Sequence, residues 1–234
     1  MKSFKALSAL LSYPSPELQE AIPAIRAVLQ EEGLFGPQRM DAIERLLRRL
    51  ADGDIWDLQE DYVLLFDRSR TLSLNLFEHI HGESRDRGGA MLDLLETYRA
   101  GGFDLQGPEL PDHLPVLLEF LSTQPEPVAR DILADAGPIL SALSDRLARR
   151  ASPYGAVLEA VSTFARAGDD AQSAAVAAVP DDDPEDLAAL DAVYAEAQVV
   201  FGPDPGAGCP ASREMLARMA PVPAPAAAPV PAAG

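Results

Sequence analysis

Apolar side chains recur three and four residues apart along most of the chain, whereas the alternation of apolar and polar residues that marks a β-strand is almost absent. In one segment, the apolar residues with this spacing are Met40, Ile43, Leu47 and Leu50. Such spacing places the apolar side chains on one face of a helix. The pattern therefore predicts an all-α fold, a single globular domain of about nine helices.

Residues that start and end helices divide this pattern into segments. Ser15, Asp54 and Asp112 each stand before an apolar run, where a side-chain oxygen caps the first turn of a helix. The Gly-Pro pair at 137–138 is expected to kink or divide the helix predicted over 125–150. The connections between these segments are short, as is typical of helices packed in one domain.

The composition changes along the chain and predicts three parts. The helical pattern extends over residues 1–200, and a loop rich in Gly and Pro, followed by a short helix, occupies 201–220. Residues 221–234 are only Pro, Ala, Val and Gly, so we expect a disordered tail without any side chain large enough to anchor it. Residues 165–182 are rich in Ala, Asp and Gly, and we expect a mobile connection there.

The stretch from Tyr62 to Arg87 carries the densest mixture of aromatic, aliphatic and charged residues. One apolar run ends at Phe66, charged residues interrupt it, and a second run ends at Phe77, before Gly82 breaks the helix. We interpret this stretch as the wall of a binding groove. The alternative is a buried corner between two helices, with its charged side chains in solvent.

The charge of the chain narrows the class of partner. The formal net charge is −18, which repels nucleic acid and anionic membranes and favours a basic partner. No Lys or Arg occurs between Arg166 and Arg213, so the negative charge is concentrated in the C-terminal third. No apolar run approaches the roughly 20 residues that span a bilayer. The single cysteine, Cys209, excludes an internal disulfide and fits a reducing cytoplasm.

The residues with reactive side chains do not form a recognisable catalytic or metal-binding motif. His79 and His81 are two residues apart, so on a helix they point to different faces and cannot both bind one metal ion without unwinding. His113 follows Asp112 as an oriented base would, but a helix-starting hydrogen bond explains the pair equally well. Cys209 has no basic neighbour that would lower its pKa. We therefore predict no catalytic, metal or cofactor site.

Two blocks carry a resemblance to a known family. YVLLFDRSRTLSLNLFEHIHGESRDRG at 62–88 and ELPDHLPVLLEFL at 109–121 closely resemble the NarJ-type nitrate reductase assembly chaperones, which belong to the wider TorD-like family of redox-enzyme maturation proteins. The resemblance covers most of residues 1–150 and returns weakly over 194–209. It implies an all-helical cytoplasmic chaperone without catalytic activity.

The resemblance also implies a client and a way of handling it. The client would be the catalytic alpha subunit of a respiratory nitrate reductase, held by its basic N-terminal segment, a remnant of a twin-arginine signal. The chaperone would keep the apo subunit competent for insertion of the molybdenum cofactor and would delay its docking at the membrane. We expect no nucleic-acid partner, no direct membrane insertion, and a monomer or a dimer.

The candidate client-binding residues combine the family's motif positions with the apolar and acidic residues of the central stretch. They are Tyr62, Phe66, Leu72, Leu74, Phe77, Glu78, His79, His81, Arg85, Arg87, Asp112, His113 and Glu119. The family's motifs also fall on Gly82, Glu83 and Pro111. We expect the apolar anchors Phe66 and Phe77 to contribute more to binding than the acidic run 181–183.

Two other functions remain open at this point. The chain could carry a small molecule or cofactor within its helical bundle, or it could be an enzyme that uses Asp112-His113 or the His79/His81 pair as general base. An enclosed pocket around the histidines would favour the enzyme, whereas an open groove lined by Leu and Phe would favour the chaperone.

Overall fold

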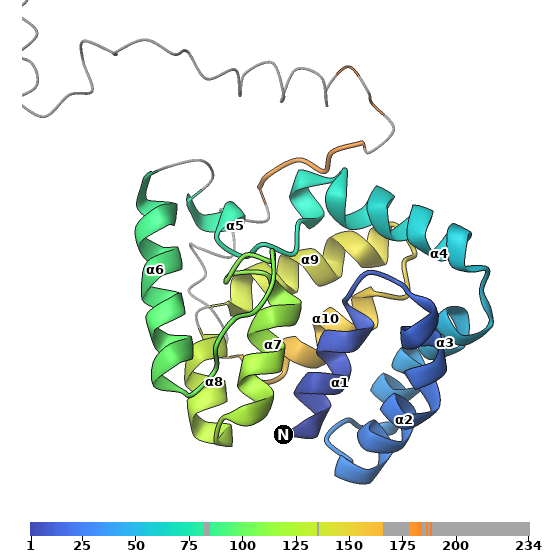
Figure 1. The fold of residues 1–234 in the computed structure, drawn as a ribbon. Helices are drawn as coiled ribbons and strands as arrows, with labels where there is room; N and C mark the ends of the chain where they lie inside the picture. Colours follow the sequence, from blue (N-terminus) through green and yellow to red (C-terminus); the bar gives the residue numbers. More distant parts are fainter. Residues whose placement is uncertain (82–84, 135, 166–177, 184–185, 187, 189–234) are drawn as a thin grey trace, which may run out of the picture. The chain divides into compact units, whose positions relative to one another are not determined.

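Ten α-helices make up most of the described part of the chain, as Figure 1 shows, and this part contains no strand. The computed structural model describes residues 1–81, 85–134, 136–165, 178–183, 186 and 188. The helices are α1 (Lys2–Leu10), α2 (Pro16–Glu32), α3 (Pro37–Asp52), α4 (Ile55–Tyr62), α5 (Glu78–His81), α6 (Arg85–Ala100), α7 (Leu114–Thr123), α8 (Glu126–Ala134), α9 (Gly137–Arg149) and α10 (Gly155–Ser162). The predicted all-α fold is confirmed.

Two of the three helix starts predicted from the sequence are confirmed. The Ser15 hydroxyl accepts a hydrogen bond from the amide of Leu18 at 3.2 Å, and the Asp54 carboxylate accepts one from the amide of Trp56 at 2.9 Å. The Gly-Pro pair at 137–138 divides the expected long helix into α8 and α9. The expectation for Asp112 is wrong, because α7 starts one residue later and has no side-chain cap.

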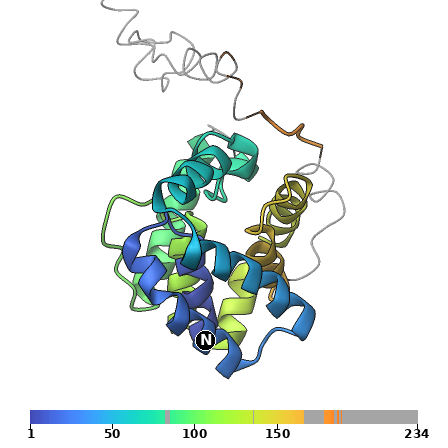
Figure 2. The ribbon, with the colours of Figure 1, turned by 90° about the vertical axis from the view of Figure 1, so that its right-hand side faces the viewer.

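Helix α1 packs against α7, α2 and α10, and α10 in turn packs against α9 and α3 (Figures 1 and 2). Phe4, Leu7 and Leu10 point from α1 into the core and are fully buried. Because these residues lie three apart, one face of a short helix contributes all of them. Helix α1 therefore contributes a fully buried face to the core that it shares with α2, α7 and α10.

The central stretch departs from regular helix directly after α4. A π-helical turn, η1 (Val63–Asp67), continues α4, and a 3-10 turn, η2 (Arg70–Leu72), follows. A π-helical turn inserts one residue into the helix and rotates the side chains that follow it, and such turns are frequent at functional sites. The departure places Asp67 at the end of the helix rather than on its buried face, and Asp67 is exposed.

The described residues form one compact unit within Met1–Leu190. The expected domain limit at residue 200, the loop and short helix over 201–220 and the tail over 221–234 lie outside the described residues. The same holds for residues 166–177 of the expected mobile connection, whereas 178–182 are described and make several polar contacts. No helix in the described part is long and apolar enough to cross a membrane.

Glu32, at the end of α2, caps the first turn of α1. Its carboxylate accepts hydrogen bonds from the amides of Lys2 at 2.7 Å and Ser3 at 2.8 Å. Burial alone would raise the pKa of Glu32, but the hydrogen bonds from Ser3 and Lys2 outweigh it and hold the pKa below its ordinary value. This contact ties the start of α1 to α2, although the two residues are far apart in the sequence.

We predict that Glu32→Ala lowers the free energy of unfolding by about 1 kcal/mol at neutral pH, because two helix-end amides lose their acceptor. Since the pKa of Glu32 is lowered by folding, its contribution is fully present above about pH 5 and disappears as the pH falls through the folded-state pKa. Urea unfolding at neutral pH and at pH 3 measures both effects. Glu31→Ala is the matched control, and an equal loss in both variants would contradict the capping role.

Candidate functional site

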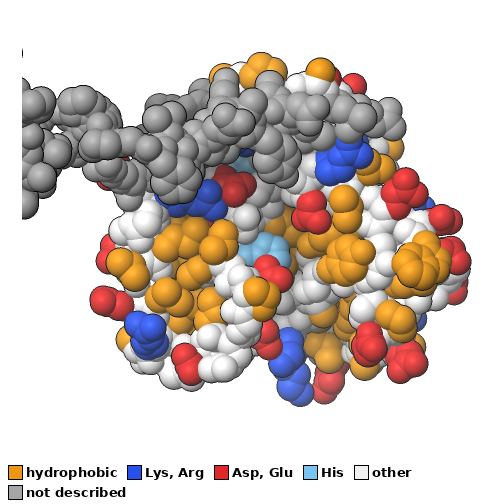
Figure 3. Space-filling model, turned by 45° about the horizontal axis from the view of Figure 1, so that its top comes forward, with side chains coloured by type: hydrophobic (Ala, Val, Ile, Leu, Met, Phe, Trp, Pro, Cys, Tyr) orange, Lys and Arg blue, Asp and Glu red, His pale blue; other side chains and the backbone are white. Residues whose placement is uncertain are grey.

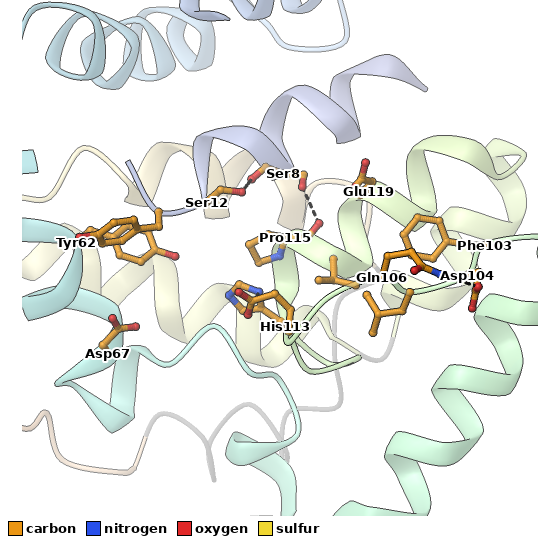
Figure 4. A pocket seen from close by; sticks show the side chains of 14 residues that line it. Ser8, Ser12, Tyr62, Asp67, Phe103, Asp104, Gln106, His113, Pro115 and Glu119 are labelled. Atoms are coloured by element: carbon orange, nitrogen blue, oxygen red, sulfur yellow. Dashed lines mark hydrogen bonds and ion pairs between the residues drawn. The ribbon is translucent and has the colours of Figure 1, made fainter. Parts of the chain in front are cut away.

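A cavity with a volume of about 600 Å³ opens to the surface between α1, α4, the π-turn η1, α7 and the loop that precedes α7. Its lining residues are Ser8, Ser12, Tyr13, Tyr62, Asp67, Phe103, Asp104, Leu105, Gln106, Glu109, His113, Pro115, Val116 and Glu119. We call this cavity the groove. Figure 4 shows Tyr62 and Asp67 at one end, His113 and Pro115 in the middle, and Phe103, Asp104 and Glu119 at the other end.

The groove is acidic. Its lining includes four carboxylates, from Asp67, Asp104, Glu109 and Glu119, and no Lys or Arg. At the rim, Glu119 pairs with Lys5 at 3.2 Å, an exposed pair that contributes little. No Lys or Arg in the described part of the chain pairs with Asp67. Asp67 is exposed but loses part of its hydration to the groove wall, and this partial desolvation raises the pKa of its carboxyl against the opposing effect of His113. The groove therefore presents negative charge that a basic ligand would neutralise.

His113 lies among these acids without being charged by them. Its Nδ1 is 3.5 Å from Glu109, and its side chain is 18% exposed. Burial lowers the pKa of His113, although the carboxylates of Glu109, Asp112 and Asp67 act in the opposite direction. The imidazole is therefore neutral at neutral pH and does not cancel the acidic charge of the groove.

Aromatic and aliphatic side chains supply apolar surface beside the acids. Tyr13 is 49% exposed, and its ring packs edge-on against Tyr62 at 5.5 Å. The Tyr62 hydroxyl donates to the carbonyl of Leu11 at 2.9 Å, and the Ser8 hydroxyl donates to the carbonyl of Pro115 at 2.6 Å. These bonds fix the walls of the groove. On the face shown in Figure 3, hydrophobic side chains gather on both sides of a histidine, with acidic side chains among them.

Beside the groove, residues 73–77 and 110–114 are held together by backbone hydrogen bonds, an arrangement we call the clasp. The amide of Leu114 donates to the carbonyl of Leu74 at 2.8 Å, and the amide of Leu76 donates to the carbonyl of Asp112 at 3.1 Å. Asn75 and His113 form an isolated antiparallel bridge. The clasp therefore joins the two sequence blocks that carry the family resemblance and sets the position of His113.

The Asp112 side chain explains why this residue does not cap α7. It is fully buried, and its carboxylate accepts a hydrogen bond from the amide of Phe77 at 3.0 Å. Arg87 lies 3.8 Å from this carboxylate and donates to Glu78 at 3.1 Å. Burial raises the pKa of Asp112, while the amide of Phe77 and Arg87 act to lower it. Asp112 is thus a buried support for the clasp.

The structure distributes the sequence-predicted site residues over three places. Tyr62, His113 and Glu119 line the groove. Phe77 and Asp112 belong to the clasp, and Glu78, His79 and Arg87 lie beside it. Arg87 is 3.1 Å from Glu78 and 3.8 Å from Asp112, and His79 Nε2 is 2.8 Å from the carbonyl oxygen of Ser73. Phe66, Leu72 and Leu74 are buried in the core and do not line the groove, and their contact with a client stays a prediction. The side chains of His81 and Arg85, and all of Gly82 and Glu83, lie outside the described residues.

Only three of the residues that line the groove, Tyr62, His113 and Glu119, were predicted from the sequence. Tyr13 and the loop 103–109 contribute to its wall, but neither shows a motif or a helical period. Asp67 and Glu109 lie within the two family-like blocks and were not singled out. The sequence could have indicated both as binding residues. Each is an acid at the edge of an apolar run, in a chain whose partner is expected to be basic.

The arrangement suits binding better than acid–base catalysis. His113 lines the groove and His79 does not, so these two histidines do not share it, and the side chain of His81 lies outside the described residues. The groove is open, and its acids surround a neutral imidazole. Among the described residues, no group of three or more His, Cys, Asp or Glu is placed to hold a metal ion. The groove can instead take up a basic segment with apolar side chains.

Comparison with known proteins places the chain in a family. The sequence profile of the family described as nitrate reductase delta subunit matches residues 14–160. The chain is 41% identical over 209 residues to the nitrate reductase molybdenum cofactor assembly chaperone NarJ of Escherichia coli (strain K12), which covers 86% of each chain. It is 36% identical over 212 residues to the probable nitrate reductase molybdenum cofactor assembly chaperone NarW of the same organism, covering 91% of this chain and 89% of the relative.

A more distant relative agrees with these two. The probable nitrate reductase molybdenum cofactor assembly chaperone NarJ of Bacillus subtilis (strain 168) is 33% identical over 156 residues, which cover 67% of this chain and 84% of the relative. Residues 14–160, which the family profile matches, include the central stretch, the clasp and the groove residues from Tyr62 to Glu119. The extent and the identity of these matches show that the chain belongs to the nitrate reductase delta subunit family.

Proposed function

We propose that this chain is a chaperone of nitrate reductase assembly that binds the basic N-terminal segment of the apo alpha subunit in the acidic groove. While bound, the alpha subunit stays competent for insertion of the molybdenum cofactor, and its docking at the membrane is delayed. The relatives' names support the chaperone role. The observation that carries the mode of recognition is the groove itself, which combines four carboxylates with exposed aromatic surface and lacks any Lys or Arg in its lining.

The groove suits an amphipathic basic segment for two physical reasons. Carboxylates such as Asp67 and Glu109 accept charge-assisted hydrogen bonds from Arg or Lys. Apolar side chains of the segment can pack on Tyr13, Phe103 and Val116, and each well-buried side chain contributes about 1.5–3 kcal/mol. The acids would speed the encounter and select a basic partner, while the apolar contacts would slow dissociation.

Binding of this kind explains how a chaperone can act without catalysis. A protein that binds only the unloaded or undocked state of its client stabilises that state by mass action. Once the cofactor is inserted, any change that buries or moves the N-terminal segment removes the binding site and releases the chaperone. The order of loading and docking then follows from competition for one segment.

A fluorescence anisotropy titration tests this proposal with a labelled peptide of the alpha subunit's N-terminal segment. We expect saturable binding of one peptide per chain, which weakens when the Arg and Lys residues of the peptide are replaced by Gln. Raising the salt from about 0.05 to 0.5 M shortens the Debye length from roughly 14 to 4 Å, so association should slow while dissociation changes little. Equal binding of the Gln-substituted peptide would contradict the proposal.

A further inference from the structure

Residues 179–183, which we call the strap, carry part of the acidic C-terminal block and lie against the central stretch. The Asp182 carboxylate accepts hydrogen bonds from the Ser69 hydroxyl at 2.6 Å, from the Thr71 amide at 3.2 Å and from the Thr71 hydroxyl. Arg150 donates to the same carboxylate at 3.1 Å and to the Asp182 carbonyl at 2.7 Å. Asp182 thus occupies a site built from η2 and the end of α9.

Asp181 binds the same helix through two arginines. Arg149 donates to its two carboxylate oxygens at 3.0 and 2.8 Å, and Arg146 Nε donates to it at 3.0 Å. Arg146 is 2% exposed, and it also donates to the carbonyls of Thr71 at 3.3 Å and Val179 at 3.0 Å. One buried guanidinium therefore joins the strap, η2 and α9. The acids at 181 and 182 are engaged within the chain.

The strap contacts the middle of a connector that touches the groove at both ends. The connector, residues 67–75, begins at Asp67 in the groove wall and ends at Asn75, which forms the bridge to His113. Between these ends, η2 packs on α9, and Ser69 is fully buried beneath the strap. No strap residue lines the groove. The hydrogen bonds of the strap with Ser69 and Thr71 therefore reach the groove through the connector.

We propose that the strap is a latch: its docking in the site formed by Ser69, Thr71, Arg146, Arg149 and Arg150 holds the connector in the conformation that forms the client groove. The link to client binding rests on the function proposed above. Docking of the strap and binding of the client segment are then coupled, and by thermodynamic linkage each strengthens the other by the same factor.

The charges of this contact favour a defined docked state. Burial alone would raise the pKa of Asp182, but the hydrogen bonds from Ser69 and Thr71 outweigh it and keep the carboxylate ionised at neutral pH. Release of the strap would remove the Asp181 carboxylate and the Val179 carbonyl from Arg146, whose side chain is 2% exposed while the strap is docked. The connector would lose, at the same time, the hydrogen bonds that Ser69 and Thr71 donate to Asp182.

The double variant Asp181→Asn/Asp182→Asn tests the latch by two independent readouts. Hydrogen exchange of the amides of 67–72 should quicken by at least about fivefold, and the affinity for the alpha-subunit peptide should fall by a similar factor. Asp93→Asn/Asp145→Asn is the matched control, because both residues are exposed, on α6 and α9, and the two substitutions remove the same charge as the double variant. Arg150→Gln removes the guanidinium that donates to Asp182 while leaving the strap sequence unchanged. It should produce the same faster exchange and the same loss of affinity.

The outcomes test two statements separately: that the strap holds the connector, and that this contact is coupled to client binding in the groove. Unchanged exchange over 67–72 in both the double variant and Arg150→Gln would overturn the latch, whatever the peptide does. Faster exchange with unchanged peptide affinity would overturn the coupling to the groove. If the wild-type chain fails to bind the peptide, the proposed function fails, and with it the coupling to the client, while the exchange measurement still decides whether the strap holds the connector.

Discussion

A chain carrying Phe66→Ala is expected to lose about 3–5 kcal/mol of its free energy of unfolding, the range found when a large core side chain is truncated. Phe66 is 5% exposed and packs against the ring of Tyr62 at 4.9 Å and that of Tyr154 at 5.2 Å. Removing it leaves a cavity beside the rings of Tyr62 and Tyr154, which can fill the space only in part. Urea unfolding followed by circular dichroism measures the loss.

The control for this variant is Trp56→Ala, which truncates an aromatic side chain that is 76% exposed. It should change the free energy of unfolding by less than about 0.5 kcal/mol. A correctly folded Phe66→Ala chain of nearly wild-type stability that no longer binds the client peptide would contradict the core assignment. It would return Phe66 to the binding surface, as the sequence had suggested.

The second large effect is expected on binding. The double variant Asp67→Asn/Glu109→Gln should weaken binding of the alpha-subunit peptide by about 5- to 30-fold at low salt, since each partly exposed ion pair contributes about 0.5–1 kcal/mol. Both acids line the groove, and in the described part of the chain neither pairs with a Lys or Arg. The loss should shrink as salt rises, because the same charges are then screened. Isothermal titration at two salt concentrations measures it.

Asp57→Asn/Asp93→Asn removes the same charge from exposed positions on α4 and α6 that do not line the groove. This control separates a local contact from the general effect of a chain with net charge −18. Equal losses of affinity in the two double variants would mean that only the overall charge attracts the peptide. The groove would then have no particular role in recognition.

The fold was predictable because local signals and packing agree. Ser15 and Asp54 are good caps, and the apolar spacing of α1 and α3 matches the faces that they bury. Asp112 was assigned the wrong role because capping is judged from neighbours in the sequence, whereas its actual partner, the amide of Phe77, lies 35 residues away. The π-turn η1 also has no sequence signature comparable to a Pro or Gly.

The site was predictable only in part, and for a physical reason. The central stretch does reach the groove, through Tyr62 and Asp67, but an apolar residue beside a helix break can equally turn inward, as Phe66 and Leu72 do. Where a helix changes its twist, the spacing of apolar residues does not distinguish a side chain that faces the core from one that faces the groove. The acidic C-terminal block was expected to offer free negative charge to a partner. A count of charges does not reveal that Arg146, Arg149 and Arg150 form ion pairs with Asp181 and Asp182.

The central claim is that the client segment lies in the acidic groove, and photo-crosslinking tests it most directly. A peptide of the alpha subunit's N-terminal segment, carrying benzoylphenylalanine at an apolar position, is bound, irradiated and mapped by mass spectrometry. The account predicts adducts on Tyr13, on the loop 103–109 or on Val116, all lost with excess unlabelled peptide. Adducts confined to the separate cavity beside α3, lined by residues 36–39, Ala42 and Glu159, would contradict it.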